Sequence, residues 1–60
     1  MTRGLRNNNP LNIRKNSTKW QGLSATQTDK SFFQFTSMAY GYRAAFKTLQ
    51  TYILNKYDTD

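Results

Sequence analysis

The spacing of apolar residues changes near residue 37 and divides the chain into two parts. In the second part the apolar positions recur three and four residues apart, which is the spacing of one face of a helix. They are Tyr42, Ala45, Phe46, Leu49, Tyr52 and Ile53. The pattern predicts an amphipathic helix over residues 38–56, whose apolar face packs on the rest of the chain. Thr36 or Ser37 is expected to be its N-cap, because a hydroxyl there accepts a hydrogen bond from an early backbone N–H.

The first part of the chain is polar and predicts loops joined by short extended segments. Residues 1–19 are rich in turn-forming asparagine, glycine and proline. Three extended segments are expected over 11–14, 20–23 and 31–36, the second with a bend at Gly22 and the third with Phe33 and Phe35 inward and Gln34 outward. The predicted fold class is therefore α+β, a small irregular antiparallel sheet packed on one C-terminal amphipathic helix.

Two local features leave alternatives open. Gly41 lies inside the first turns of the predicted helix, where it costs about 1 kcal/mol relative to alanine, so it indicates either close packing or a later helix start. Asp58, Thr59 and Asp60 are good N-caps for a following helix. The chain is thus interpreted either as a single small domain over 1–60 or as the truncated N-terminal part of a longer one.

Composition narrows the classes of protein and of site. A chain of 60 residues forms one domain at most, and with no cysteine and no histidine neither a disulfide nor a structural zinc site is expected to staple it. Its core must come from the nine aromatic residues: one tryptophan, four tyrosines and four phenylalanines. No segment has the apolar length of a membrane span or of a signal peptide, so neither a transmembrane segment nor a signal peptide is predicted.

The formal net charge of +6 favours polyanions as partners without choosing among them. One alternative is a nucleic-acid-binding module, because five basic residues lie in the first third of the chain beside Trp20. Those residues are Arg3, Arg6, Arg14, Lys15 and Lys19. The plainer alternative is that the charge only keeps a small protein soluble.

The side chains needed for common hydrolytic chemistry are scarce. The acidic residues are Asp29, Asp58 and Asp60, and there is no glutamate, whereas glycan-cleaving enzymes need a carboxylic acid that protonates the leaving oxygen. Asp29 precedes the third extended segment and is interpreted first as a turn or capping residue. We therefore predict no catalytic residue, no metal site and no cofactor, and no independent catalysis by this chain.

The run Asn7-Asn8-Asn9-Pro10 is the most unusual local feature. Asparagine side chains satisfy local backbone groups and tolerate left-handed conformations, so a tight turn explains the run. The same amides also suit the hydroxyl and N-acetyl groups of a sugar chain. Trp20 is interpreted in the same two ways, as a core residue or as a face on which a sugar stacks.

Several motifs in order resemble a known group of proteins. The stretch from Arg3 to Arg14, followed by Trp20-Gln21-Gly22-Leu23, by Thr28-Asp29 with Phe33 and Phe35, and by Gly41-Tyr42-Arg43-Ala44-Ala45 with Leu49 and Tyr52, is similar to phage and Bacteroidetes-type prophage proteins. These are often labelled virion structural or lysozyme-like proteins. A more distant similarity links the same order to the glucosaminidases of the lysozyme superfamily, whose corresponding piece floors the glycan cleft.

This resemblance implies a phage or prophage protein associated with peptidoglycan, with a glycan-binding or scaffolding role. It implies a sugar-binding surface lined by Asn9, Asn12 and Trp20, with Arg6 and Arg14 meeting acidic cell-wall groups. Members of the group run about twice this length, with a further helix beginning near Asp58. The expected partners are peptidoglycan or a related glycan and other virion proteins, and the expected location is the virion, or the bacterial cytoplasm before lysis. A structural interaction fragment, whose exposed helix face pairs with another segment, is a further alternative.

Overall fold

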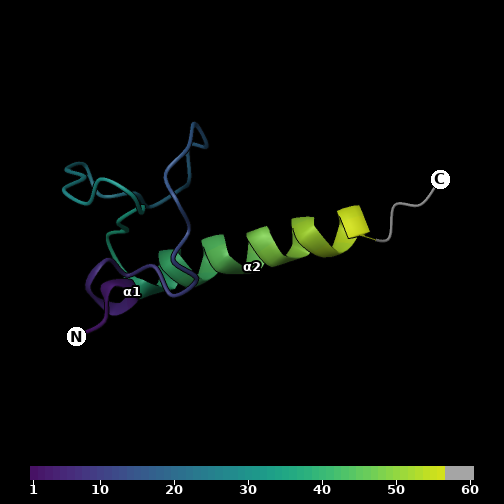
Figure 1. Ribbon diagram of the computed structural model, residues 1–60, viewed down its shortest axis with the longest axis horizontal. Coiled ribbons are helices and arrows are strands. Elements are labelled where there is room, and N and C mark those ends of the chain that lie inside the picture. The colour runs from purple at the N-terminus through teal and green to yellow at the C-terminus, as the bar shows by residue number, and fades with distance from the viewer. Residues whose placement is uncertain (57–60) are drawn as a thin grey trace.

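The structure is a computed structural model that describes residues 1–56, and within them it contains two helices. Helix α1 spans Arg3–Arg6 and helix α2 spans Met38–Lys56. Between them the chain forms a body of loops around the start of α2, and the rest of α2 projects away from this body (Figure 1).

Helix α2 confirms the helix predicted over 38–56. It follows Ser37, whose Oγ accepts a hydrogen bond from the Tyr40 N–H at 3.5 Å, as an N-cap does. The further helix expected near Asp58 lies outside the described residues.

Helix α1 was not expected, because the polar first residues predict only turns. The Thr2 side chain caps it by accepting a hydrogen bond from the Leu5 N–H at 3.4 Å. Its other end is closed by Asn7, whose backbone N–H donates to the Arg3 carbonyl at 2.9 Å. A helix of four residues is too short to show an apolar period in the sequence.

The predicted α+β fold with a small sheet is wrong. In the described part of the chain the expected strands 11–14, 20–23 and 31–36 form only isolated antiparallel bridges, Arg14 with Phe32 and Leu23 with Phe35. Asn12 has a φ of 51° and Gly22 a φ of 82°, and such left-handed residues interrupt an extended strand. The bend expected at Gly22 is thereby confirmed.

Side-chain amides take the place of a strand ladder. Fully buried Asn9 donates through Nδ2 to the carbonyls of Ile13 and Phe33, at 3.1 and 2.9 Å, and accepts through Oδ1 from the Ile13 N–H at 2.9 Å. Gln27 in the same way accepts from the Gln34 N–H at 2.9 Å and donates to the Gln34 carbonyl at 2.7 Å. Backbone groups that would pair strands in a sheet are satisfied by these amides instead.

The core is small and lies where the third segment meets the start of α2. Phe33, Phe35 and Ala44 are buried together, so the inward orientation predicted for the two phenylalanines is confirmed. Their rings lie 6.3 Å apart between centroids, a distance typical of aromatic pairs. Half-buried apolar side chains surround this cluster: Ile13, Trp20, Leu23 and Tyr40.

Gly41 allows the asparagine-rich turn to pack directly on α2. A Cβ atom at this position would lie 1.9 Å from the backbone oxygen of Asn8, far inside any real contact. Asn8 in turn has a left-handed φ of 53° and donates through Nδ2 to the Phe35 carbonyl at 3.0 Å. Of the two alternatives for Gly41, close packing is confirmed and a later helix start is wrong, since α2 begins at Met38.

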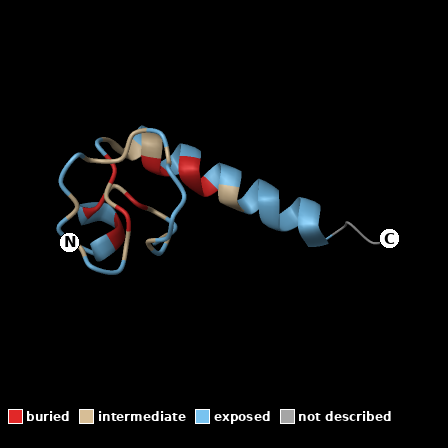
Figure 2. Ribbon diagram, turned by 90° about the horizontal axis from the view of Figure 1, so that it is seen from above, coloured by how far each residue is buried: buried red, intermediate tan, exposed pale blue. Residues whose placement is uncertain are grey.

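The predicted packing of the helical apolar face is wrong over most of α2. Only Gly41, Ala44 and Ala45 are buried on this helix, and all three lie in its first half (Figure 2). The large apolar side chains of the expected face are exposed: Tyr42, Phe46, Leu49, Tyr52 and Ile53. The body is too small to reach along the helix, which rises about 1.5 Å per residue.

Candidate functional site

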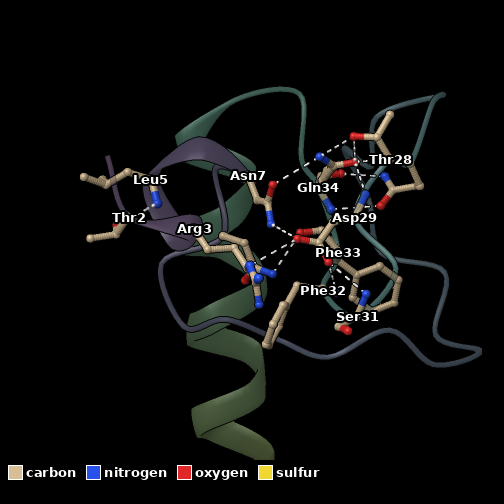
Figure 3. A network of polar contacts seen from close by, with 12 residues as sticks. Thr2, Arg3, Leu5, Asn7, Thr28, Asp29, Ser31, Phe32, Phe33 and Gln34 are labelled. Atoms are coloured by element: carbon tan, nitrogen blue, oxygen red, sulfur yellow. Dashed lines mark hydrogen bonds and ion pairs between the residues drawn. The ribbon is translucent and has the colours of Figure 1, made fainter.

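A network of polar side chains joins α1 to the loop before the third segment (Figure 3). The buried Asn7 amide donates to Asp29 Oδ2 at 3.1 Å and accepts from Gln34 Nε2 at 3.1 Å. The Arg3 guanidinium lies 3.5 Å from the same Asp29 oxygen. A polar hollow of about 200 Å³ opens beside these residues and is also lined by Arg6 and Thr28.

Asp29 is the central acceptor of this network. Its Oδ1 accepts hydrogen bonds from the backbone N–H groups of Ser31 and Phe32, at 2.8 and 3.0 Å. The Ser31 N–H, followed by the Asn7 amide, the Phe32 N–H and the positive charge of Arg3, lowers the pKa of Asp29 from 3.8 to about 2. These contacts match the turn and capping role predicted for Asp29. A carboxylate with this pKa is deprotonated near neutral pH and has no proton to donate to a leaving group.

The five residues expected to bind a glycan do not converge on one hollow among those that the described chain forms. Asn9 is fully buried, and its amide is engaged with backbone groups. Arg6 lines the polar hollow beside Asp29. Trp20 lines a different hollow.

The other two predicted residues lie at the surface. The Asn12 side chain is exposed near Gly4. The Arg14 guanidinium lies 4.9 Å from the centroid of the Phe32 ring, and that of Arg3 lies 5.2 Å from the same centroid. Cation–π contacts of this kind stabilise the local arrangement and leave the charges accessible.

The hollow at Trp20, named here the threonine groove, has a volume of about 370 Å³. Trp20 is half-buried, and its Nε1 is enclosed without a hydrogen-bond partner among the described residues. The remaining lining consists of hydroxyl and amide side chains from the loop and from α2: Asn16, Thr18, Thr48 and Thr51. Trp20 is a predicted site residue, whereas the other four were not predicted, because nothing in their spacing brings residues 16–18 beside 48–51.

The second surface is the exposed apolar side of α2, named here the apolar stripe and made of Tyr42, Phe46, Leu49 and Ile53. These side chains are 61, 66, 49 and 52% exposed. Three of them, together with Gln50 and Leu54, border a shallow hollow of about 300 Å³. An apolar surface of this kind on a small protein is typical of a site that contacts another macromolecule.

The residues of the stripe were predicted to form a face that packs on the rest of the chain, with an exposed face that pairs with another segment as the alternative. Their spacing of four, three and four residues is compatible both with a core face and with a docking face, so the sequence does not distinguish the two.

Residues 1–56 include no helix that is long and apolar enough to cross a membrane. The same residues bring together no group of three or more side chains of the types that ligate metals.

The chain is similar to Protein P5 of Pseudoalteromonas phage PM2, with 43% identity over 53 residues. The match covers 83% of this chain and 33% of the phage protein, so the chain spans about a third of the length of that relative. No known protein-family profile matches the chain. The comparison supports the phage connection of the sequence resemblance and shows no lysozyme-like family.

Proposed function

We propose that this chain is a non-catalytic structural protein of a phage or prophage, which docks on another polypeptide through the apolar stripe of α2. The observation that carries the proposal is the exposure of Tyr42, Phe46, Leu49 and Ile53 along a helix that packs on the body only through its first half. Burying a side chain of this size contributes about 1.5–3 kcal/mol, so a partner that covers the stripe gains a substantial apolar contact. The similarity to a phage protein supports a phage or prophage origin.

The amide network supports the same proposal from the other side of the molecule. Asn7, Asn9 and Asp29 hold the loops through hydrogen bonds within the chain, and the low pKa of Asp29 leaves it unsuited to proton donation. A rigid loop body with a projecting helix is suited to docking and not to acid catalysis.

The test is retention of the protein in purified particles of the phage or prophage that encodes it. The variant Ile53→Ser removes one exposed side chain of the stripe, and Leu5→Ser, an equally exposed leucine on α1, is the matched control. Quantitative mass spectrometry is expected to find the wild type and Leu5→Ser in the particles and Ile53→Ser depleted from them. Equal retention of all three proteins contradicts the proposal.

A second candidate function is glycan binding, with peptidoglycan or a related polymer as the ligand, as the lysozyme-like resemblance implies. The observation that favours it is the threonine groove, where the half-buried indole of Trp20 lies among hydroxyl and amide groups. Aromatic rings stack on sugar faces, while such polar groups bind sugar hydroxyls. Trp20 is the residue of the predicted glycan surface that takes part. Arg6, Asn12 and Arg14 are surface positions at which a longer glycan strand makes further contacts.

The glycan candidate is tested by saturation-transfer NMR with a chitooligosaccharide and a muropeptide. Transfer from the protein to the sugar is expected in the wild type and is expected to be lost in Trp20→Ala, whereas Asn12→Ala, outside the groove, retains most of it. Absence of transfer in the wild type, or equal transfer in Trp20→Ala, rules this candidate out. The nucleic-acid alternative predicts instead an affinity for single-stranded DNA that falls steeply with salt.

A further inference from the structure

The apolar stripe has the geometry of a surface that receives a second helix. At 100° per residue its four side chains fall within about 60° of one another around the α2 axis. Gly41, Ala44 and Ala45, which pack on the body, centre about 120° away from the stripe. The contact with a partner therefore does not compete with the contact that holds α2 in place.

The shape of the stripe surface also favours a helix, and not a strand or a loop, as the partner. Phe46, Leu49 and Ile53 border a shallow hollow in which Gln50 is the one polar lining residue. In a coiled-coil contact each apolar side chain of one helix enters a hole of this kind between side chains of the other. An extended strand would instead bring unpaired backbone N–H and C=O groups against this apolar surface, at a cost in free energy.

Charge distinguishes between the possible helices. The charged side chains that border the stripe are basic: Arg43 lies on one flank and Lys56 follows Ile53 at the C-terminal end, and α2 contains no acidic residue. The Lys56 ammonium group lies 6.0 Å from the centroid of the Tyr52 ring, beside the end of the stripe. A partner with acidic residues beside its own apolar positions forms opposite-charge pairs with these basic residues.

A second copy of the chain fits the stripe less well, because its charge is also positive. Its own α2 offers the same basic residues, and two chains that each carry a formal charge of +6 repel one another.

We propose that the occupant of the apolar stripe is an amphipathic helix with acidic residues beside its apolar seam. This inference rests on the proposed docking function and adds the chemistry of the partner.

The experiment uses the 60-residue chain and three synthetic helical peptides that share one leucine and isoleucine seam. Their flanking positions are all glutamate, all glutamine or all lysine, and a scrambled glutamate peptide without a seam controls for non-specific attraction to a basic protein. Binding is followed by fluorescence anisotropy at low salt and at about 0.15 M salt. Leu5→Ser and Ile53→Ser serve as the control and the stripe variant.

The glutamate peptide is expected to bind about tenfold tighter than the glutamine peptide, and the difference in affinity from the lysine peptide is expected to be larger. Both differences in affinity are expected to be smaller at the higher salt concentration. Ile53→Ser is expected to weaken binding of the seam peptides at least fivefold, whereas Leu5→Ser leaves it unchanged. Circular dichroism of both variants checks that α2 is intact.

The outcomes separate the inference from the function on which it rests. Equal binding of the glutamate and lysine peptides overturns the acidic partner and leaves the docking surface in place. Binding of the scrambled glutamate peptide as tight as that of the seam peptide, or binding that is insensitive to Ile53→Ser, overturns the inference as well. If no seam peptide binds at either salt concentration, the docking function itself fails. A dimer in sedimentation velocity of the chain alone, abolished by Ile53→Ser, assigns the stripe to a second copy and overturns the acidic partner.

Discussion

Replacing Asn9 by alanine is expected to be the most damaging single amide substitution in this protein. The side chain is fully buried and makes three hydrogen bonds, all with backbone groups of residues 13 and 33. Two of those groups, the Ile13 N–H and the Phe33 carbonyl, have Asn9 as their partner in the described structure. The Ile13 carbonyl keeps a second partner, because it also accepts from the Phe33 N–H at 3.1 Å.

The magnitude follows from these two orphaned groups. An unsatisfied buried donor or acceptor costs about 1–3 kcal/mol, and the Ile13 N–H is only part-buried, whereas the Phe33 carbonyl is buried. The expected loss is therefore about 2–4 kcal/mol. Because proteins are stabilised by only about 0.05–0.15 kcal/mol per residue, this loss removes a large part of the stability of a chain this short.

The assay is urea unfolding followed by the fluorescence of Trp20, which lies against the core that Asn9 supports. Asn16→Ala is the matched control, since Asn16 is exposed and accepts one local hydrogen bond from the Thr18 N–H at 2.9 Å. It is expected to cost less than about 0.5 kcal/mol. Asn9→Asp keeps the size of the side chain and one acceptor but loses both donated bonds, so near neutral pH it is expected to be as damaging as alanine. An Asn9→Ala protein within about 1 kcal/mol of the wild type, or a stable Asn9→Asp protein, refutes the argument.

Three other predictions address the network, the contact between helix and turn, and the groove. The pKa of Asp29 is lowered in the folded chain to about 2 from 3.8, so its contribution to stability is complete above pH 4 and is lost as pH falls towards 2; urea titrations over this range are expected to show a fall that Asp29→Asn lacks. Gly41→Ala is expected to lower the melting temperature in spite of the better helix propensity of alanine, because its Cβ would lie 1.9 Å from the Asn8 oxygen. The exposed control Gln50→Ala is expected to leave the melting temperature unchanged or to raise it, and a rise in the melting temperature of Gly41→Ala contradicts the close packing. Trp20→Phe removes the unsatisfied indole N–H and is expected to preserve or raise stability, which thermal unfolding measures. The same variant is expected to weaken any sugar binding in the threonine groove, which a sugar titration measures.

The helix and the core were predictable because their signals are local or periodic. Phe33 and Phe35 alternate with a polar residue, and the apolar positions after Met38 have a helical period, so both appear in the structure as expected. Ser37 and Asp29 act as caps through atoms of their own immediate neighbours. Such contacts depend on a few residues in sequence and are visible without a tertiary structure.

The missing sheet could not be predicted in the same way, because the decisive contacts are long-range. The hydrogen bond between Asn9 and the Phe33 carbonyl joins residues 24 positions apart, and the sequence does not indicate which backbone group a buried amide will satisfy. Apolar alternation in 31–36 is equally compatible with a paired strand and with a single extended segment held by side chains. The outcome was decided by Asn12 and Gly22, whose left-handed conformations prevent a continuous ladder.

The predicted packing of the apolar face of α2 failed for a related reason. A helical period shows that one side of a helix is apolar, but it does not show whether the covering surface belongs to the same chain. Here the loop body is held by its own amides and fully buries only the small residues Gly41, Ala44 and Ala45 of α2, with Tyr40 half-buried beside them. The small residues allow close approach of the backbone. Larger side chains at those positions would hold the body away from α2, whereas the large apolar residues lie on the side that the body does not reach. The division between small buried residues and large exposed ones on a single helix is the reason to regard the apolar stripe as a binding surface and not as an incomplete core.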